Sequence, residues 1–193
     1  MVFVGSDDQL TVPTSVKIVI AGGFGTGKTT MVSSVSEIPP LKTEELLTEA
    51  GVHVDDLAGI EGKNTTTVAL DFGRITINAS VVLYLFGTPG QNRFWFMWDE
   101  LAHGAIGAVV LVDTRRLDSS FPSIDFFEHR GVPFIVAVNC FDGGQLYTVD
   151  EVRHALDLDD AIPVLLCDAR DRESSKAVLV GLIQHSMNRL APA

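Results

Sequence analysis

Residues 22–30 of this chain combine glycine, lysine and threonine at a spacing suited to binding phosphate. The segment fits the pattern G-x-x-x-x-G-K-[ST] without a mismatch and consists of Gly22, Gly23, Phe24, Gly25, Thr26, Gly27, Lys28, Thr29 and Thr30. Glycines let successive backbone N–H groups converge on an anion, and a following helix N-terminus adds positive potential. We expect Lys28 to reach the β- and γ-phosphates of a nucleotide and the Thr29 hydroxyl to bind Mg²⁺. A glycine-rich turn without a ligand is the alternative interpretation.

The phosphate-binding segment lies between a predicted strand and a predicted helix, which is the context that such a loop requires. Residues 16–21 form an apolar run typical of a buried strand, and the helix from residue 27 is expected to end before Pro39. Further strands are predicted at residues 67–72, 79–86, 106–113, 132–138 and 163–167, and helices at 43–51, 93–103, 121–130, 149–156 and 178–190.

This alternation predicts an α/β protein with a mostly parallel six-stranded sheet flanked by helices. Residues 67–73 and 79–86 are candidates for an antiparallel hairpin, because only a short connection joins them. Residues 1–15 are expected to form a flexible N-terminal extension, and residues 16–193 a single domain.

Charge and composition restrict the classes of protein to which the chain can belong. With 14 Lys and Arg against 25 Asp and Glu, the net charge of −11 opposes non-specific binding to nucleic acid and docking on anionic lipid. Two cysteines offer no disulfide framework, and no apolar run is long enough to span a bilayer. Secretion and lipidation signals are also missing. We therefore expect a cytoplasmic protein that would need a partner to recruit it to a membrane.

Two further predicted strand ends carry motifs that, together with the phosphate-binding loop, resemble the Ras-like small GTPases. Residues 87–91, Gly-Thr-Pro-Gly-Gln, resemble the D-x-x-G-Q element, which implies that Gly90 binds the γ-phosphate and Gln91 orients the attacking water. Residues 138–142, Val-Asn-Cys-Phe-Asp, resemble N-K-x-D, which implies that Asp142 accepts the N1–H and N2–H₂ groups of guanine. The resemblance implies a P-loop NTPase with the Ras-like G-domain fold, GTP or GDP as ligand, and Mg²⁺ as cofactor.

The same resemblance assigns roles to the remaining candidate residues. Thr67 corresponds to the switch I threonine that binds Mg²⁺ beside a γ-phosphate, with Thr65 and Thr66 as rivals, and Thr29 is the other candidate metal ligand. Residues 167–170 resemble the S-A-K element behind the base. The base is thus expected to meet Asn139, Cys140, Asp142, Asp168, Ala169 and Arg170. The candidate catalytic residues are Gln91 and Lys28.

Three positions depart from the family pattern. Gly87 stands where the family has an aspartate that holds Mg²⁺ through water; Asp71 and Asp113 are alternatives for that role, although Asp113 is more simply interpreted as a cap after its strand. Phe24 stands where Ras has a glycine, and its bulk is expected to obstruct an activator's arginine finger, which favours slow hydrolysis. Cys140 replaces a lysine that ties this motif to the phosphate loop, which predicts weaker guanine binding.

Residues 71–75 and 85–98 resemble the MglA-type bacterial branch, and within it the GTPase of actinobacterial conservon operons. This implies a signalling switch that works with a roadblock-type regulatory protein and a membrane sensor-kinase-like protein, through switch regions near residues 60–75 and 87–100. The large apolar residues 94–98 predict either packing against the long segment before Thr67 or an exposed partner surface. A hydrolysis-deficient guanine-nucleotide-binding scaffold is the alternative function. An ATPase or small-molecule kinase is a third, which Asp142 opposes.

Overall fold

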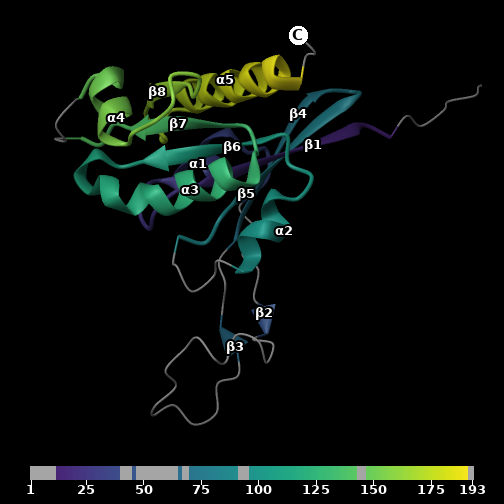
Figure 1. The fold of residues 1–193 in the computed structure, drawn as a ribbon. Helices are drawn as coiled ribbons and strands as arrows, with labels where there is room; N and C mark the ends of the chain where they lie inside the picture. The colour runs from purple at the N-terminus through teal and green to yellow at the C-terminus, as the bar shows by residue number, and fades with distance from the viewer. Residues whose placement is uncertain are drawn as a thin grey trace, which may run out of the picture.

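The strands of the main sheet are the apolar runs of the sequence, and their burial follows their composition. The computed structural model describes residues 12–39, 45–46, 65–66, 70–90, 96–142 and 147–190. The central strands β1 (Thr14–Ala21), β6 (Gly107–Val112) and β7 (Phe134–Asn139) are flanked by β8 (Val164–Cys167) on one side and by β5 (Val81–Gly87) and β4 (Asp71–Asn78) on the other. The order in the six-stranded sheet is β4-β5-β1-β6-β7-β8, and the pairings are parallel apart from β4 with β5 (Figure 1). The predicted fold class is confirmed.

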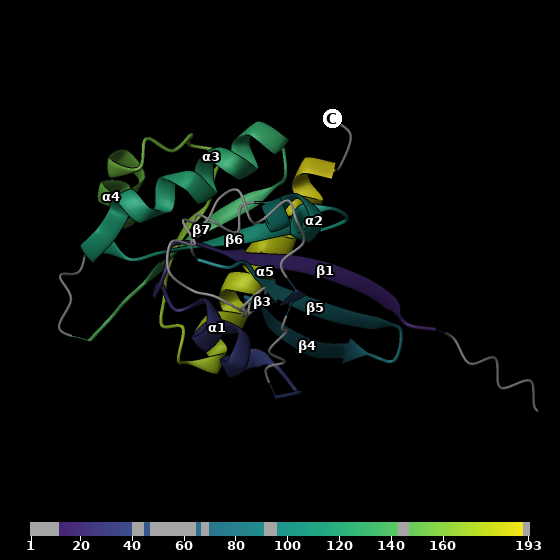
Figure 2. The same cartoon turned by 90° about the horizontal axis from the view of Figure 1, so that it is seen from below.

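Helices cover both faces of this sheet. On one face, α1 (Lys28–Val35) and α5 (Arg172–Leu190) share a buried cluster with the sheet that includes Met31, Leu179 and Leu182. On the other, α2 (Trp98–Ala102), α3 (Phe121–Arg130) and α4 (Val149–Ala155) contribute Trp98, Phe127 and Val152, respectively, to a second cluster (Figure 2). A 3-10 helix, η2 (Thr114–Ser120), joins β6 to α3. The sheet is thus buried on both sides, which explains why β6 is apolar throughout and β7 is apolar up to Asn139.

The hairpin of β4 and β5 has a register that matters for the site. Asp71 pairs with Gly87 at its open end, and Asn78 pairs with Val81 beside the turn, with a bulge between Thr76 and Asn78. The Asn78 side chain accepts a hydrogen bond from the Ser80 N–H at 2.8 Å, which closes the turn. Because β4 runs against β5, the first residue of β4 lies at the edge where the parallel strands end.

The structure corrects the helix predicted at residues 43–51. Glu45–Leu46 forms a short strand, β2, which pairs in an antiparallel manner with β3 (Thr65–Thr66); the other residues of that prediction lie outside the described part of the chain. The short run of Glu and Leu satisfies a helix pattern equally well, and a cross-strand pairing with a segment twenty residues later overrides such a weak local preference.

Several element boundaries also differ from expectation; α5, for example, begins at Arg172 and not at residue 178. β4 begins at Asp71 and continues to Asn78, whereas the sequence predicted a strand at 67–72. The prediction missed these bounds because the edge strand is only partly buried and lacks a continuous apolar run. β1 includes Thr14 and Ser15, which the sequence assigned to the extension; both are exposed, so nothing in their composition marks the strand. Of the helix predicted at 93–103, the described part is α2, and residues 91–95 lie outside the description.

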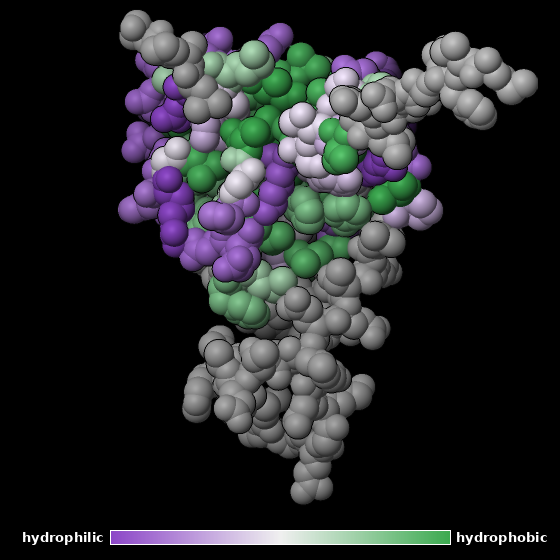
Figure 3. All heavy atoms as spheres, turned by 90° about the vertical axis from the view of Figure 1, so that its right-hand side faces the viewer, coloured by the Kyte–Doolittle hydropathy of each residue, from purple (hydrophilic) through white to green (hydrophobic). Residues whose placement is uncertain are grey.

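The surface of the molecule mixes residue types. On the face shown in Figure 3, hydrophobic residues lie among hydrophilic ones, as on most protein surfaces. Among the described helices, none combines the length and the apolar character that crossing a bilayer requires.

Candidate nucleotide-binding site

The loops that carry the candidate residues meet at one edge of the sheet. β1, β5, β7 and β8 run parallel, so the segments after Ala21, Gly87, Asn139 and Cys167 emerge at their carboxyl ends. Open α/β sheets bind ligands at this edge. The motifs that the sequence analysis singled out in the described residues therefore face a common region.

The phosphate loop has a backbone shape that suits glycine. Gly27, directly before α1, has φ of 103°, which side chains rarely adopt. A Cβ atom there would also lie 2.5 Å from the Nδ2 atom of Asn139. Glycine at this position thus lets the loop turn into the helix while Asn139 approaches its backbone.

Lys28 is held inside this loop. Its side chain is 7% exposed, and Nζ donates hydrogen bonds to the carbonyl oxygens of Gly22 at 2.9 Å and Gly23 at 2.7 Å. Burial lowers the pKa of Lys28 to about 8, while the nearby carboxylate of Asp71 acts in the opposite direction. The ammonium group is therefore positioned for an anion rather than extended into solvent.

A cavity of about 350 Å³ lies beside Lys28 and matches the predicted phosphate site. Its lining residues are Phe24, Gly25, Gly27, Lys28, Thr29, Thr30, Asp71, Thr88, Pro89 and Gly90. The Thr88 hydroxyl is buried and has no hydrogen-bond partner within the described part of the chain. Phe24 is 66% exposed. The structure thus brings the phosphate loop together with Gly90, as predicted, and adds Asp71 and Thr88.

Asp71 takes the position expected of the missing aspartate at Gly87. The Thr29 hydroxyl donates to Asp71 Oδ2 at 2.7 Å. A Cβ on Gly87 would meet Asp71 Cβ at 2.8 Å and Oδ2 at 2.9 Å, so the glycine makes room for a carboxylate from the neighbouring strand. Hydroxyl and carboxylate oxygens are suitable Mg²⁺ ligands. Of the two alternatives that the sequence left open, Asp71 faces Thr29.

Asp113 has the capping role that the sequence favoured for it. Its buried side chain accepts a hydrogen bond from the Arg115 N–H at 3.0 Å and caps η2. No group of three or more His, Cys, Asp or Glu within the described residues could hold a metal. A cation at Thr29 and Asp71 would therefore need phosphate oxygens or water to complete its coordination, as Mg²⁺ usually does.

Asn139 links the base side of the site to the phosphate loop. Its Nδ2 donates to the carbonyl oxygen of Thr26 at 3.0 Å, and its Oδ1 accepts from the Ala169 N–H at 3.0 Å. The side chain is buried. One amide thus joins the loops after β1, β7 and β8, which gives the asparagine at this point of the motif a structural role.

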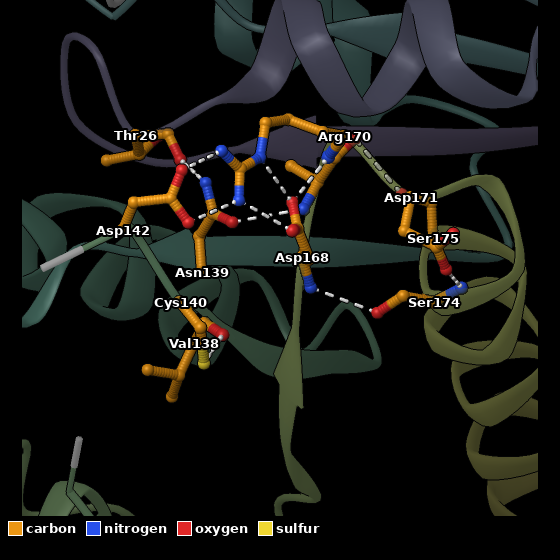
Figure 4. A network of polar contacts seen from close by, with 11 residues as sticks. Thr26, Val138, Asn139, Cys140, Asp142, Asp168, Arg170, Asp171, Ser174 and Ser175 are labelled. Atoms are coloured by element: carbon orange, nitrogen blue, oxygen red, sulfur yellow. Dashed lines mark hydrogen bonds and ion pairs between the residues drawn. The ribbon is translucent and has the colours of Figure 1, made fainter. Parts of the chain in front are cut away.

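Asp142, Arg170 and Asp168 form a network at the base side (Figure 4). The Arg170 guanidinium donates to both carboxylate oxygens of Asp142, through Nη1 to Oδ2 and through Nη2 to Oδ1 at 3.0 Å. It also donates to Asp168 through Nε at 2.9 Å and Nη2 at 2.8 Å. These hydrogen bonds lower the pKa of Asp142, and they lower that of Asp168 to about 2, so both carboxylates are ionised at neutral pH.

The two cysteines differ in their surroundings. Cys167 is 4% exposed at the end of β8, and burial raises the pKa of its thiol to about 12. Cys140 is half-buried next to Asn139.

In the native protein at pH 8 we expect iodoacetamide to modify Cys140 at least ~100 times faster than Cys167, because the thiolate is the reactive form. Mass spectrometry over time measures both rates. Equal rates before unfolding, or faster labelling of Cys167, would contradict this assignment.

Several sequence predictions concern residues outside the description. Thr67 and Gln91 lie there, and of Thr65 and Thr66 only the strand β3 is described, so their predicted roles remain predictions. In the apolar run 94–98, Met97 and Trp98 are buried, and the Trp98 ring lies 5.3 Å from that of Phe126. Phe96 is 59% exposed. Packing thus accounts for two of these residues, and one is presented at the surface.

Sequence reasoning missed Arg115 and Arg116. They follow β6, whose carboxyl end lies at the same sheet edge as the motifs. Arg116 Nη2 donates to the carbonyl oxygen of Phe24 at 2.9 Å, and the Arg115 guanidinium lies 3.9 Å from the centre of the Phe141 ring. Two consecutive arginines directly after a buried strand, with an aspartate before them, were the available signal.

Comparisons with known proteins agree with this geometry. The family described as "conserved hypothetical ATP binding protein" matches residues 20–189. An uncharacterized protein of Methanocaldococcus jannaschii is 29% identical over 135 residues, which span 69% of this chain and 75% of that protein. The G domain of the FeoB iron transporter of T. maritima superposes with a TM-score of 0.62 at 16% identity, covering 90% of this chain and 99% of that one. The FeoB G domain of Methanococcus jannaschii superposes with a TM-score of 0.59 at 15% identity, again covering 90% of this chain and 99% of that one. The chain thus has the G-domain fold.

Proposed function

The chain belongs to the family described as conserved hypothetical ATP-binding proteins, and within it we propose a guanine-nucleotide-binding protein that hydrolyses GTP slowly in the presence of Mg²⁺. The observation that carries the choice of guanine is the pairing of Asp142 with Arg170. A guanidinium presents two parallel N–H donors to both carboxylate oxygens, and the N1–H and N2–H₂ edge of guanine presents a similar pair. Adenine has no such pair of donors on one edge.

The phosphate side of the site supplies the groups that phosphoryl transfer needs. Lys28 and the N–H groups of the loop would hold the β- and γ-phosphates, and Thr29 with Asp71 would hold Mg²⁺. The cation would neutralise charge that develops on the phosphate oxygens. Gln91 is proposed to orient water on the strength of the motif alone. The exposed Phe24 at this cavity supports the proposal that an arginine from an activator has restricted access.

We assign the switch role to the same protein on the basis of the resemblance described above. Its MglA-type pattern suggests a roadblock-type regulatory protein as the partner, and a membrane sensor-kinase-like protein as a further partner. The exposed Phe96, close in sequence to Gln91, supports a partner surface beside the γ-phosphate sensor.

Equilibrium binding of GDP and ADP to the nucleotide-free protein tests the proposed ligand. We expect GDP to bind at least ~100-fold more tightly than ADP, since guanine, unlike adenine, presents two adjacent N–H donors that can take the place of the Arg170 guanidinium on the Asp142 carboxylate. Tighter binding of ADP would instead support the literal description of the family and would overturn the proposal. Single-turnover release of phosphate from GTP then separates slow hydrolysis from the hydrolysis-deficient scaffold, because the scaffold would bind GTP and release no phosphate.

A further inference from the structure

We propose that Asp113, Arg115 and Arg116 form an arginine clamp that joins the base-recognition loop to the phosphate loop and thereby slows nucleotide release. The inference rests on the proposed function, because it concerns how the same site retains a guanine nucleotide. The three residues lie directly after β6, between the loops that they contact.

Asp113 is the fixed point of the clamp. Its side chain is 0% exposed. Oδ1 accepts from Arg115 Nε at 2.8 Å, and Oδ2 accepts from Arg115 Nη2 at 2.8 Å and from Arg116 Nη2 at 3.4 Å. The hydrogen bonds from Arg115 lower the pKa of Asp113, so that the carboxylate is ionised despite its burial. A buried carboxylate is costly unless it is paired, which fixes both guanidinium groups in place.

Arg116 contacts the phosphate loop at Phe24. Its Nη2 donates to the carbonyl oxygen of Phe24 at 2.9 Å, and a Cβ built on Gly25 would lie 3.1 Å from the same nitrogen. Arg116 lines a second cavity, which adjoins the phosphate cavity at Phe24 and Gly90. Its guanidinium supports the loop backbone through the Phe24 carbonyl group.

Arg115 reaches the base-recognition loop. Its guanidinium carbon lies 3.9 Å from the centre of the Phe141 ring, which is the geometry of a cation–π contact. Phe141 directly precedes Asp142, the residue proposed to bind guanine. Through Asp113, the backbone of Phe24 and the ring of Phe141 are thus connected by two arginines.

The clamp compensates for a departure noted in the sequence. Cys140 stands where related motifs have a lysine that ties this loop to the phosphate loop, and its thiol lies 3.8 Å from the Val138 carbonyl oxygen. The arginine clamp makes an equivalent connection from another strand end. Since the clamp holds the two loops together, it is expected to affect GDP and GTP retention alike.

The test measures release of a fluorescent GDP analogue from the full chain. Arg116→Ala is expected to raise the dissociation rate about tenfold, as the loss of one charge-assisted hydrogen bond would do. Release of a GTP analogue should be accelerated to a similar degree, and single-turnover GTP hydrolysis by the same variant is measured in parallel. Arg153→Ala is the matched control, because Arg153 also donates to a backbone carbonyl, that of Asp159 at 2.8 Å, away from this edge. Thermal unfolding of each variant shows whether it is folded.

A second substitution distinguishes the loss of a connection between the two loops from a general destabilisation of the folded protein. Adding Cys140→Lys to Arg116→Ala is expected to return the dissociation rate to within about threefold of the wild type. Unchanged release from Arg116→Ala, an equal effect of Arg153→Ala, an effect on hydrolysis alone, or a failure of the lysine to rescue would each overturn the clamp. Failure of the wild type to bind GDP would instead overturn the proposed function.

Discussion

Replacing Asp142 by asparagine is expected to weaken GDP binding by about 100-fold or more and to make xanthosine diphosphate the preferred ligand. In the proposed complex the carboxylate would accept two hydrogen bonds from guanine, each worth roughly 1.5–3 kcal/mol when one partner is charged, and the loss of about 3 kcal/mol corresponds to about two orders of magnitude. Xanthine carries an oxygen in place of the 2-amino group, and the asparagine NH₂ can donate to it. Competition of GDP and xanthosine diphosphate against a fluorescent nucleotide measures both effects.

The control for this substitution is Asp159→Asn, which makes the same change at another exposed aspartate. The Asp159 side chain accepts a hydrogen bond from the Ala161 N–H at 2.8 Å. It should leave the preference for GDP intact. If Asp142→Asn binds GDP as tightly as the wild type does, the base lies elsewhere, and the pairing of Asp142 with Arg170 is a surface ion pair without a role in recognition.

The second large effect concerns Asp71. Asp71→Ala is expected to raise the Mg²⁺ concentration that half-maximally slows GDP release by about 10–100-fold, which is the usual cost of removing a supporting carboxylate. The physical reason is that Asp71 Oδ2 accepts from the Thr29 hydroxyl at 2.7 Å and is the carboxylate that lines the phosphate cavity. Titration of Mg²⁺ against the dissociation rate of a fluorescent GDP analogue measures this quantity without relying on hydrolysis.

Moving the carboxylate between strands sharpens this test. Gly87→Asp alone should lower the melting temperature, because its Cβ would lie 2.8 Å from that of Asp71 and two carboxylates would then share one space. Combining Gly87→Asp with Asp71→Gly should remove the clash and restore most of the Mg²⁺ dependence. If Asp71→Ala leaves the Mg²⁺ titration unchanged, the carboxylate has another role.

The sequence was sufficient for the architecture because the architecture depends on local patterns. The buried strands β6 and β7 are runs without polar interruption, and α3 spans the predicted residues 121–130. The phosphate loop could be identified because its contacts, such as that of Lys28 with Gly22 and Gly23, lie within a few residues. The motifs also placed Asn139 and Asp142 at the correct sheet edge.

Contacts between distant segments were not predictable in the same way. The pairing of Asp71 with Gly87 depends on the register of a hairpin, and residue spacing alone does not fix a register when a bulge is present. The pairing of Arg170 with Asp142 depends on how two side chains extend from separate loops. The predicted range of the strand β4 was wrong by several residues, because a half-exposed edge strand has no clear apolar pattern in the sequence.

The hairpin turn at Asn78 and Ser80 therefore matters for the proposed cation site, although it lies at the opposite end of the two strands. Side chains alternate between the two faces of a sheet, so a slip of one residue in the pairing of β4 with β5 would carry Asp71 to the face away from Thr29. An insertion or deletion in this turn that shifts the pairing by one residue would therefore remove the Asp71 carboxylate from the proposed cation site without changing Asp71 itself. Natural variation in the length of the turn should consequently be confined to changes that preserve the parity of the strand.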